Sequence, residues 1–180
     1  MNKEIKQLKD FYVTSDTWFG RSQILQIANR RTFIDVDKMN EALIENWNRV
    51  ISKDDTVFHL GNFAWDPFIA ENALKKLKGK IYFLLGNVDE ALLEVYENFK
   101  NVTIIEDQII ALPLHDVVLS HYPLLMWAGK ESGTLHIHGH AVFNHLTDLT
   151  VERRVNICTD HWGFTPIKIS TLKDFINDEI

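Results

Sequence analysis

Polar residues that can bind metal ions or phosphate groups follow five short apolar runs of this chain. A carboxylate is present at Asp16, amides at Asn62 and Asn87, and imidazoles at His121 and His140. Carboxylates, amide oxygens and neutral imidazoles ligate divalent cations, and amides and imidazoles also donate hydrogen bonds to phosphate oxygens. A glycine stands directly before Asn62, Asn87 and His140, which indicates a tight backbone turn at each of these points.

Hydrophobic patterns predict the elements that must hold these residues. A capping box at Thr171 and Asp174 is expected to open the last helix. The five polar motifs all fall where an expected strand stops, and ligands of open α/β sheets gather beyond the carboxyl ends of strands, so we expect one common site. The expected strands are 11–15, 56–60, 81–85, 102–105, 108–112, 117–120, 135–138, 155–158 and 167–169, and the other helices are 36–52, 67–77 and 90–99.

The five segments are SDTWFG (15–20), LGNF (60–63), LGNVD (85–89), SHYP (120–123) and HGHAV (138–142). In this order they resemble the motifs D-x-H, G-D, G-N-H-D/E, H and G-H-x-H of the calcineurin-like metallophosphoesterase superfamily. The likeness runs from Phe11 to about Ile169 and is greatest to a small prokaryotic and phage-type branch. It implies an α/β fold, a calcineurin-like phosphoesterase β-sandwich flanked by helices, in one domain spanning residues 1–180.

Four functional positions of that family hold residues with other chemistry. By resemblance, one metal ion would use Asp16, Asn62 and the positions of Trp18 and Val142. The other ion would use Asn62, Asn87, His121 and His140, and the position of Val88 would supply the acid that protonates the leaving group. Trp and Val offer no lone pair to a metal. We therefore expect no catalytic residue and no cofactor, with at most one weak divalent metal site at Asn62, Asn87, His121 and His140.

The remaining polar groups and aromatic rings predict a pocket that still binds a ligand. Arginines are good bidentate partners for phosphate, aromatic rings stack on nucleobases, and the carboxylate of Asp16 would face a ribose hydroxyl or an exocyclic amine. The predicted ligand-binding residues are Asp16, Trp18, Arg21, Arg30, Asn62, Phe63, Asn87, His121, His140 and Trp162. The predicted ligand is a small nucleotide or another phosphorylated compound.

Three functions stay open at this stage. The first is an inactive phosphoesterase that captures a nucleotide, for example a phage protein that sequesters a host's immune signal. The second is a residual metal-dependent phosphoesterase or phosphodiesterase, and the third is an interaction scaffold with an unused pocket. The altered motifs also allow two alternatives: His145 could replace Val142 as a ligand, and Asn62 alone could be a designed knock-out.

Composition excludes several other classes. A net charge of −6 and a pI near 5.7 argue against a protein that binds duplex nucleic acid through a basic surface. The single cysteine, Cys158, excludes an intrachain disulfide and fits a reducing compartment. No apolar run approaches the roughly 18 residues of a membrane span. We therefore expect a cytoplasmic protein without a membrane partner, and the oligomeric state is left open.

Overall fold

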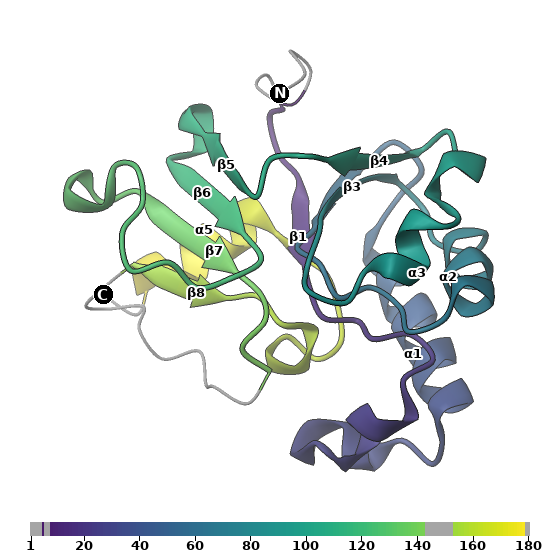
Figure 1. Cartoon of the computed structure of the whole chain (residues 1–180). Helices are drawn as coiled ribbons and strands as arrows, with labels where there is room; N and C mark the ends of the chain where they lie inside the picture. The colour runs from purple at the N-terminus through teal and green to yellow at the C-terminus, as the bar shows by residue number, and fades with distance from the viewer. Residues whose placement is uncertain (1–4, 6–7, 143–152, 179–180) are drawn as a thin grey trace.

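The computed structural model describes residues 5, 8–142 and 153–178 of the chain (Figure 1). Its first sheet has five strands in the order β4-β3-β2-β1-β9. Strands β1 to β4 run parallel, and β9 is antiparallel to β1, so the sheet is mixed. The bounds of these strands are Tyr12–Thr14 (β1), Thr56–His59 (β2), Lys80–Leu84 (β3), Val102–Ile105 (β4) and Ile167–Lys168 (β9).

The second sheet has four strands in the order β5-β6-β7-β8. The pair β5 and β6 is antiparallel, whereas β6, β7 and β8 run parallel. Their bounds are Ile109–Leu112 (β5), Val117–Ser120 (β6), Leu135–His138 (β7) and Arg154–Asn156 (β8). The expected strands are therefore all present, with ends that differ by a residue or two, except that 167–169 keeps only two residues as strand.

Two helices begin where the sequence supplies a cap. Helix α1 (Val36–Val50) begins after Asp35, whose side chain accepts the backbone N–H of Lys38. Its buried residues are Met39, Leu43 and Trp47, spaced by four positions. Helix α2 (Pro67–Leu74) begins after Asp66, which accepts two backbone N–H groups, and has proline in its first turn.

Three other segments differ from expectation. The helix expected over 90–99 is interrupted, with α3 (Glu90–Leu93) followed by the 3-10 turn η4 (Tyr96–Asn98). Helix α5 (Ile169–Asp178) begins directly after β9, so Thr171 lies inside it and the expected capping box is wrong. Two 3-10 helices that no periodic pattern predicts, η2 (Ser22–Gln26) and η3 (Ala28–Thr32), connect β1 to α1.

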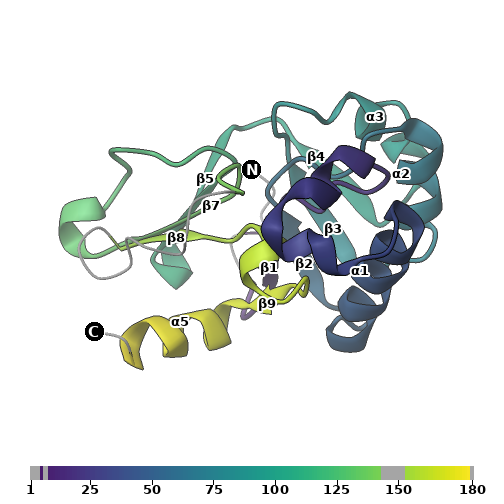
Figure 2. The same ribbon diagram turned by 90° about the horizontal axis from the view of Figure 1, so that it is seen from below.

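The two sheets face each other, and helices cover the outer side of the first. Successive side chains of β2 point to opposite faces of the sheet. Val57 packs in the cluster with α1, α2 and α3, and Phe58 packs in a second cluster between the sheets. Helix α5 contributes Ile169, Leu172 and Ile176 to the second cluster. Figure 2 shows α5 along the four-stranded sheet and α1 and α2 along the five-stranded sheet. The fold is therefore α/β, as expected, with two mixed sheets flanked by helices.

The two sheets are joined by an isolated bridge just beyond the ends of β1 and β8. Beyond the end of β1, Ser15 pairs with Cys158, and the Ser15 carbonyl accepts the N–H of Thr159 at 3.0 Å. Cys158 is fully buried, in agreement with the apolar sequence around it. Among the described residues, no helix is long and apolar enough to cross a membrane.

The core between the sheets gives a direct test of this packing. Leu119 is fully buried in it, whereas Leu125 is 80 % exposed. We expect Leu119→Ala to lower the free energy of unfolding by about 2–5 kcal/mol, because it leaves a cavity between the sheets. Leu125→Ala is the matched control and should change it by less than about 0.5 kcal/mol. Urea denaturation measures both, and equal effects would contradict this assignment of the core.

Candidate functional site

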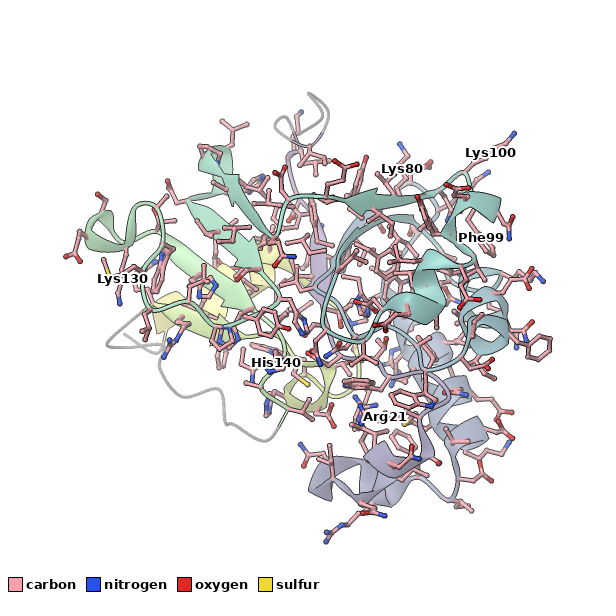
Figure 3. All side chains as sticks on the ribbon, in the orientation of Figure 1. Arg21, Lys80, Phe99, Lys100, Lys130 and His140 are labelled. Carbon is pink, nitrogen blue, oxygen red and sulfur yellow. The ribbon has the colours of Figure 1, made fainter. Side chains whose placement is uncertain are left out.

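A pocket of about 530 Å³ lies beyond the carboxyl ends of the parallel strands. Its lining includes Trp18 after β1, Asn62 after β2, Asn87 and Val88 after β3, and His140 and Val142 after β7. Segment η2–η3 forms the opposite wall with Arg21, Gln23, Ile24, Gln26, Ile27 and Arg31. Figure 3 shows His140 and Arg21 approaching this region from different parts of the fold. Of this wall, Arg21 alone is among the predicted ligand-binding residues, because residues 22–35 carry no periodic pattern.

Four polar side chains meet at the floor of the pocket. The Nε2 atom of His121 lies 3.1 Å from Asn87 Oδ1, 3.2 Å from His140 Nδ1 and 3.3 Å from Asn62 Nδ2. His140 Nδ1 is also 3.1 Å from Asn87 Oδ1. His121 and Asn62 are buried beneath, and Asn87 and His140 are the exposed members. The structure thus brings together the four residues that the motifs grouped.

The hydrogen bonds of the floor indicate which ring nitrogens donate. His121 Nδ1 lies 2.5 Å from the Leu60 carbonyl, so this nitrogen carries a proton and donates it. His140 Nδ1 lies within hydrogen-bond distance of two acceptors, His121 Nε2 and Asn87 Oδ1, and donates toward them. Burial lowers the pKa of His140, and the neighbouring His121 lowers it further, which favours the uncharged form of this exposed imidazole.

The Asp16 carboxylate is turned away from the pocket. It is completely buried and accepts hydrogen bonds from Ser15 Oγ, Asn62 Nδ2 and the His140 backbone N–H, at 2.8–2.9 Å. Burial raises the pKa of Asp16, against the lowering effects of His121 and of these donors. The expectation that Asp16 faces a ligand hydroxyl is wrong, because protein donors occupy its oxygens.

The neutral amide of Asn62 is a suitable hydrogen-bond partner for the buried Asp16 carboxylate. Its Nδ2 donates to Asp16 Oδ1 at 2.9 Å, and its Oδ1 accepts the Val88 backbone N–H at 3.2 Å. A carboxylate at position 62 would lie as close to the Asp16 carboxylate as the Asn62 amide does. Two negative charges so close together in a buried site are stable only with a proton or a cation between them. The amide therefore removes the need for a positive charge at this point.

The loops of the site are held by Asp89, to which the sequence motifs assigned no binding role. Its carboxylate accepts the backbone N–H groups of Asn62, Phe63 and Gly86 at 2.6–2.8 Å. Gly61 must be glycine, because a Cβ atom there would collide with the Gly86 backbone. Asp89 thus joins the loop after β2 to the loop after β3. An acidic residue shortly after a glycine turn is the one local signal that could have revealed it.

Backbone strain is concentrated at the site. Asp16, Trp18, Asn62 and His140 all have left-handed backbone conformations, with φ between 53° and 64°. Such residues cost roughly 1–3 kcal/mol each and persist only where surrounding contacts hold them, most often at functional sites. The clustering supports a functional assignment for this pocket.

Three side chains without a metal-binding atom line the pocket where the resemblance expects catalytic chemistry. They are Trp18, Val88 and Val142. Trp18 is only 5 % exposed, and its indole Nε1 has no hydrogen-bond acceptor within the described part of the chain. One face of Trp18 is covered by the Arg21 guanidinium, 4.2 Å from the ring centroid.

Arg30 has a structural role, so its prediction as a phosphate partner is wrong. The side chain is completely buried and forms an ion pair with Asp160 at 2.6 Å. It also donates to the backbone carbonyls of Asp16 and Thr17. Every guanidinium nitrogen is thereby engaged, and the group fixes the first loop of the site from behind.

Two further predicted residues lie outside the pocket lining. Phe63 is fully buried, with its ring packed edge-on against Phe19 and Phe83. Trp162 packs against Phe175 and donates its indole N–H to the Asn156 carbonyl. Neither is placed to stack on a ligand in this pocket. His145, the alternative ligand to Val142, falls outside the described residues.

Comparison with known proteins gives relatives along nearly the whole chain, although no family model matches it. An uncharacterized protein of Methanocaldococcus jannaschii, MJ1445, is 28% identical over 176 residues, covering 94% of this chain and 92% of that protein. The gene 66 protein of Mycobacterium phage L5 is 25% identical over 191 residues, covering 87% and 89%.

Solved structures give the same picture of the fold. The protein of unknown function AQ665 from Aquifex aeolicus superposes with a TM-score of 0.68 at 22% identity, covering 92% of this chain and 98% of that one. A novel archaeal phosphodiesterase reaches a TM-score of 0.48 at 21% identity, covering 83% and 82%. The likeness to AQ665 shows a shared fold.

The role of the Asn62 amide can be tested with one substitution. We expect Asn62→Asp to lower the free energy of unfolding by about 3–5 kcal/mol in a chelating buffer at pH 7, because it adds an uncompensated buried charge beside Asp16. Asn98→Asp, at an exposed position of η4, is the control and should change little. Urea denaturation measures both variants. An unchanged free energy of unfolding in Asn62→Asp would show that the amide is not needed there.

Proposed function

We propose that this protein is a phosphoesterase-like scaffold that binds a nucleotide-type phosphorylated ligand and does not hydrolyse it. The observation that carries the proposal is the composition of the 530 Å³ pocket, which keeps Asn62, Asn87 and His140 on its floor beside Trp18, Val88 and Val142. Polar groups that can hold a ligand are present, and groups that could activate water or protonate a leaving group are replaced.

Loss of hydrolysis follows from the chemistry of the replacements. If the family resemblance holds, Trp18 and Val142 stand at ligand positions of one metal ion, and neither has an atom that coordinates a cation. Val88 stands at the position of the acid and cannot transfer a proton. Because the steps of such a mechanism act together, losing one metal and the acid removes most of the rate enhancement.

The walls of the pocket support a nucleotide-sized ligand. The volume falls within the roughly 300–1,000 Å³ typical of small-molecule sites. Ile24 and Ile27 give the wall an apolar part that suits a base or sugar, and Arg21 and Arg31 add two cations that suit phosphate. Binding without cleavage is what a sequestering protein requires. A phage protein that removes a host's nucleotide signal would work in this way, and one relative of the chain is a phage protein.

A second candidate, a residual one-metal phosphoesterase, is favoured by the close approach of one amide oxygen and two imidazole nitrogens at the floor, where a metal ion would displace the ring proton of His140 from Nδ1 to Nε2. Asn87 Oδ1, His121 Nε2 and His140 Nδ1 lie 3.1–3.2 Å apart. Ligands of a tetrahedral zinc ion at about 2.0–2.1 Å are separated by roughly 3.3 Å. The described residues include no group of three or more His, Cys, Asp or Glu that could hold a metal, so any such site depends on neutral amides.

Metal analysis separates these two candidates. After dialysis against a chelator and then Mn²⁺ or Zn²⁺, we expect well under two metal ions per chain by elemental analysis, since Trp18 and Val142 cannot complete the first site. With either metal, turnover of bis-p-nitrophenyl phosphate should stay at background. Two bound ions with robust turnover would overturn the inactive assignment, and one ion with turnover abolished by His121→Ala would establish the second candidate.

Ligand binding is tested by a thermal-shift screen of nucleotides and cyclic nucleotides, followed by calorimetric titration of the hits. Binding to the native state raises its melting temperature. We expect His140→Ala to weaken binding about ten- to hundredfold, because it removes an exposed hydrogen-bonding group from the floor. Arg49→Gln, an exposed change on α1, should have no effect.

The bound compound recovered by chromatography should be intact. Recovery of a cleaved product would make the protein an enzyme. If no compound of the screen shifts the melting temperature, the binding proposal fails and the interaction scaffold is favoured.

A further inference from the structure

The guanidinium of Arg21 lies against two indole rings at the pocket. Its central carbon lies 4.2 Å from the ring centroid of Trp18 and 4.7 Å from that of Trp65. Two cation–π contacts restrict a side chain that otherwise has many rotamers. These contacts do not consume the N–H donors of the group, which are left for other partners.

No carboxylate of the described chain is paired with this cation. Arg21 forms neither an ion pair nor a side-chain hydrogen bond with the residues that the structure describes, although Arg30 nearby uses all its nitrogens. Arg31 stands on the same wall and gives only its Nε, to the Gln26 carbonyl. Among the residues that the structure describes, the wall therefore presents positive charge toward the pocket without a paired carboxylate.

The opposite side of the pocket does not offer comparable charge. Burial lowers the pKa of His140, which favours its uncharged form, and its Nδ1 is engaged with Asn87 and His121. The buried carboxylate of Asp16 lies directly behind, where it accepts the backbone N–H of His140. A phosphate placed on this floor without a cation would face neutral groups backed by a negative one.

We propose that Arg21, in contact with the rings of Trp18 and Trp65, is the anion-binding group of this pocket, so that the phosphate of the ligand lies at the η2–η3 wall and its uncharged part lies over Asn87 and His140. The planar guanidinium edge matches a phosphate oxygen pair in a bidentate way. Trp65, which is 49 % exposed and absent from the pocket lining, is a positioning residue that acts through Arg21. The inference rests on the proposed function and specifies the part of the ligand that sets affinity.

The experiment compares nucleoside monophosphates with their uncharged nucleosides. Calorimetry is carried out on the wild type and on Arg21→Gln, Arg21→Lys and Trp65→Leu, with Arg49→Gln as the control. We expect the wild type to prefer the nucleotide, and Arg21→Gln to weaken nucleotide binding about ten- to hundredfold without changing nucleoside binding. Arg21→Lys should keep part of the preference. Trp65→Leu should lower nucleotide affinity alone, which a general loss of structure would not do.

Two outcomes overturn different conclusions. If the nucleotide binds and His140→Ala weakens it, but Arg21→Gln leaves the preference for phosphate unchanged, the anion lies elsewhere and this inference fails while the proposed function stands. If no nucleotide or nucleoside binds the wild type, the proposed function fails and the assignment of Arg21 fails with it. Equal losses for nucleotide and nucleoside in Trp65→Leu would show that Trp65 supports the fold and does not position Arg21.

Discussion

The burial of the Asp16 carboxylate is the constraint on which the site depends. A charged group without solvent contact requires hydrogen-bond donors, and these come from Ser15, from Asn62 after β2 and from the backbone of His140 after β7. The hydrogen bonds to the Asp16 carboxylate therefore join loops from both sheets. Arg30 adds to this from behind by binding the carbonyls of Asp16 and Thr17. The left-handed conformations around the pocket are stable because these bonds hold them.

Hydrogen bonds within the chain are enough to join the loops of this site. Asn62 donates to Asp16, and Asp89 accepts three backbone N–H groups from the loops after β2 and β3. The loop that carries Asn62 is thus held from two sides, by the carboxylate of Asp16 and by that of Asp89.

Most of the framework could be predicted from local pattern, because β2 is a short run that is buried throughout and α1 carries its buried residues at the helical period. The partners of charged residues could not. Arg30 looked available for phosphate, yet its partner Asp160 lies 130 residues later in the chain. The η2–η3 wall was missed because short 3-10 turns have no amphipathic repeat. The four floor residues could be predicted as one group because each follows the end of a strand. Which of them are exposed could not be predicted, because exposure depends on packing.

The position of β1 has a consequence for synthesis. This strand is made early, but it pairs with β9 near the other end of the sequence, and its continuation at Ser15 pairs with Cys158. The loop that carries Asp16 cannot be enclosed until Asp160 has emerged from the ribosome to bind Arg30. A growing chain therefore exposes strand β1 and a half-built site until these later segments are made, at about 5–20 residues per second. Contacts of such long range also favour slow folding, so chaperones that shield apolar strands have their longest opportunity on this segment.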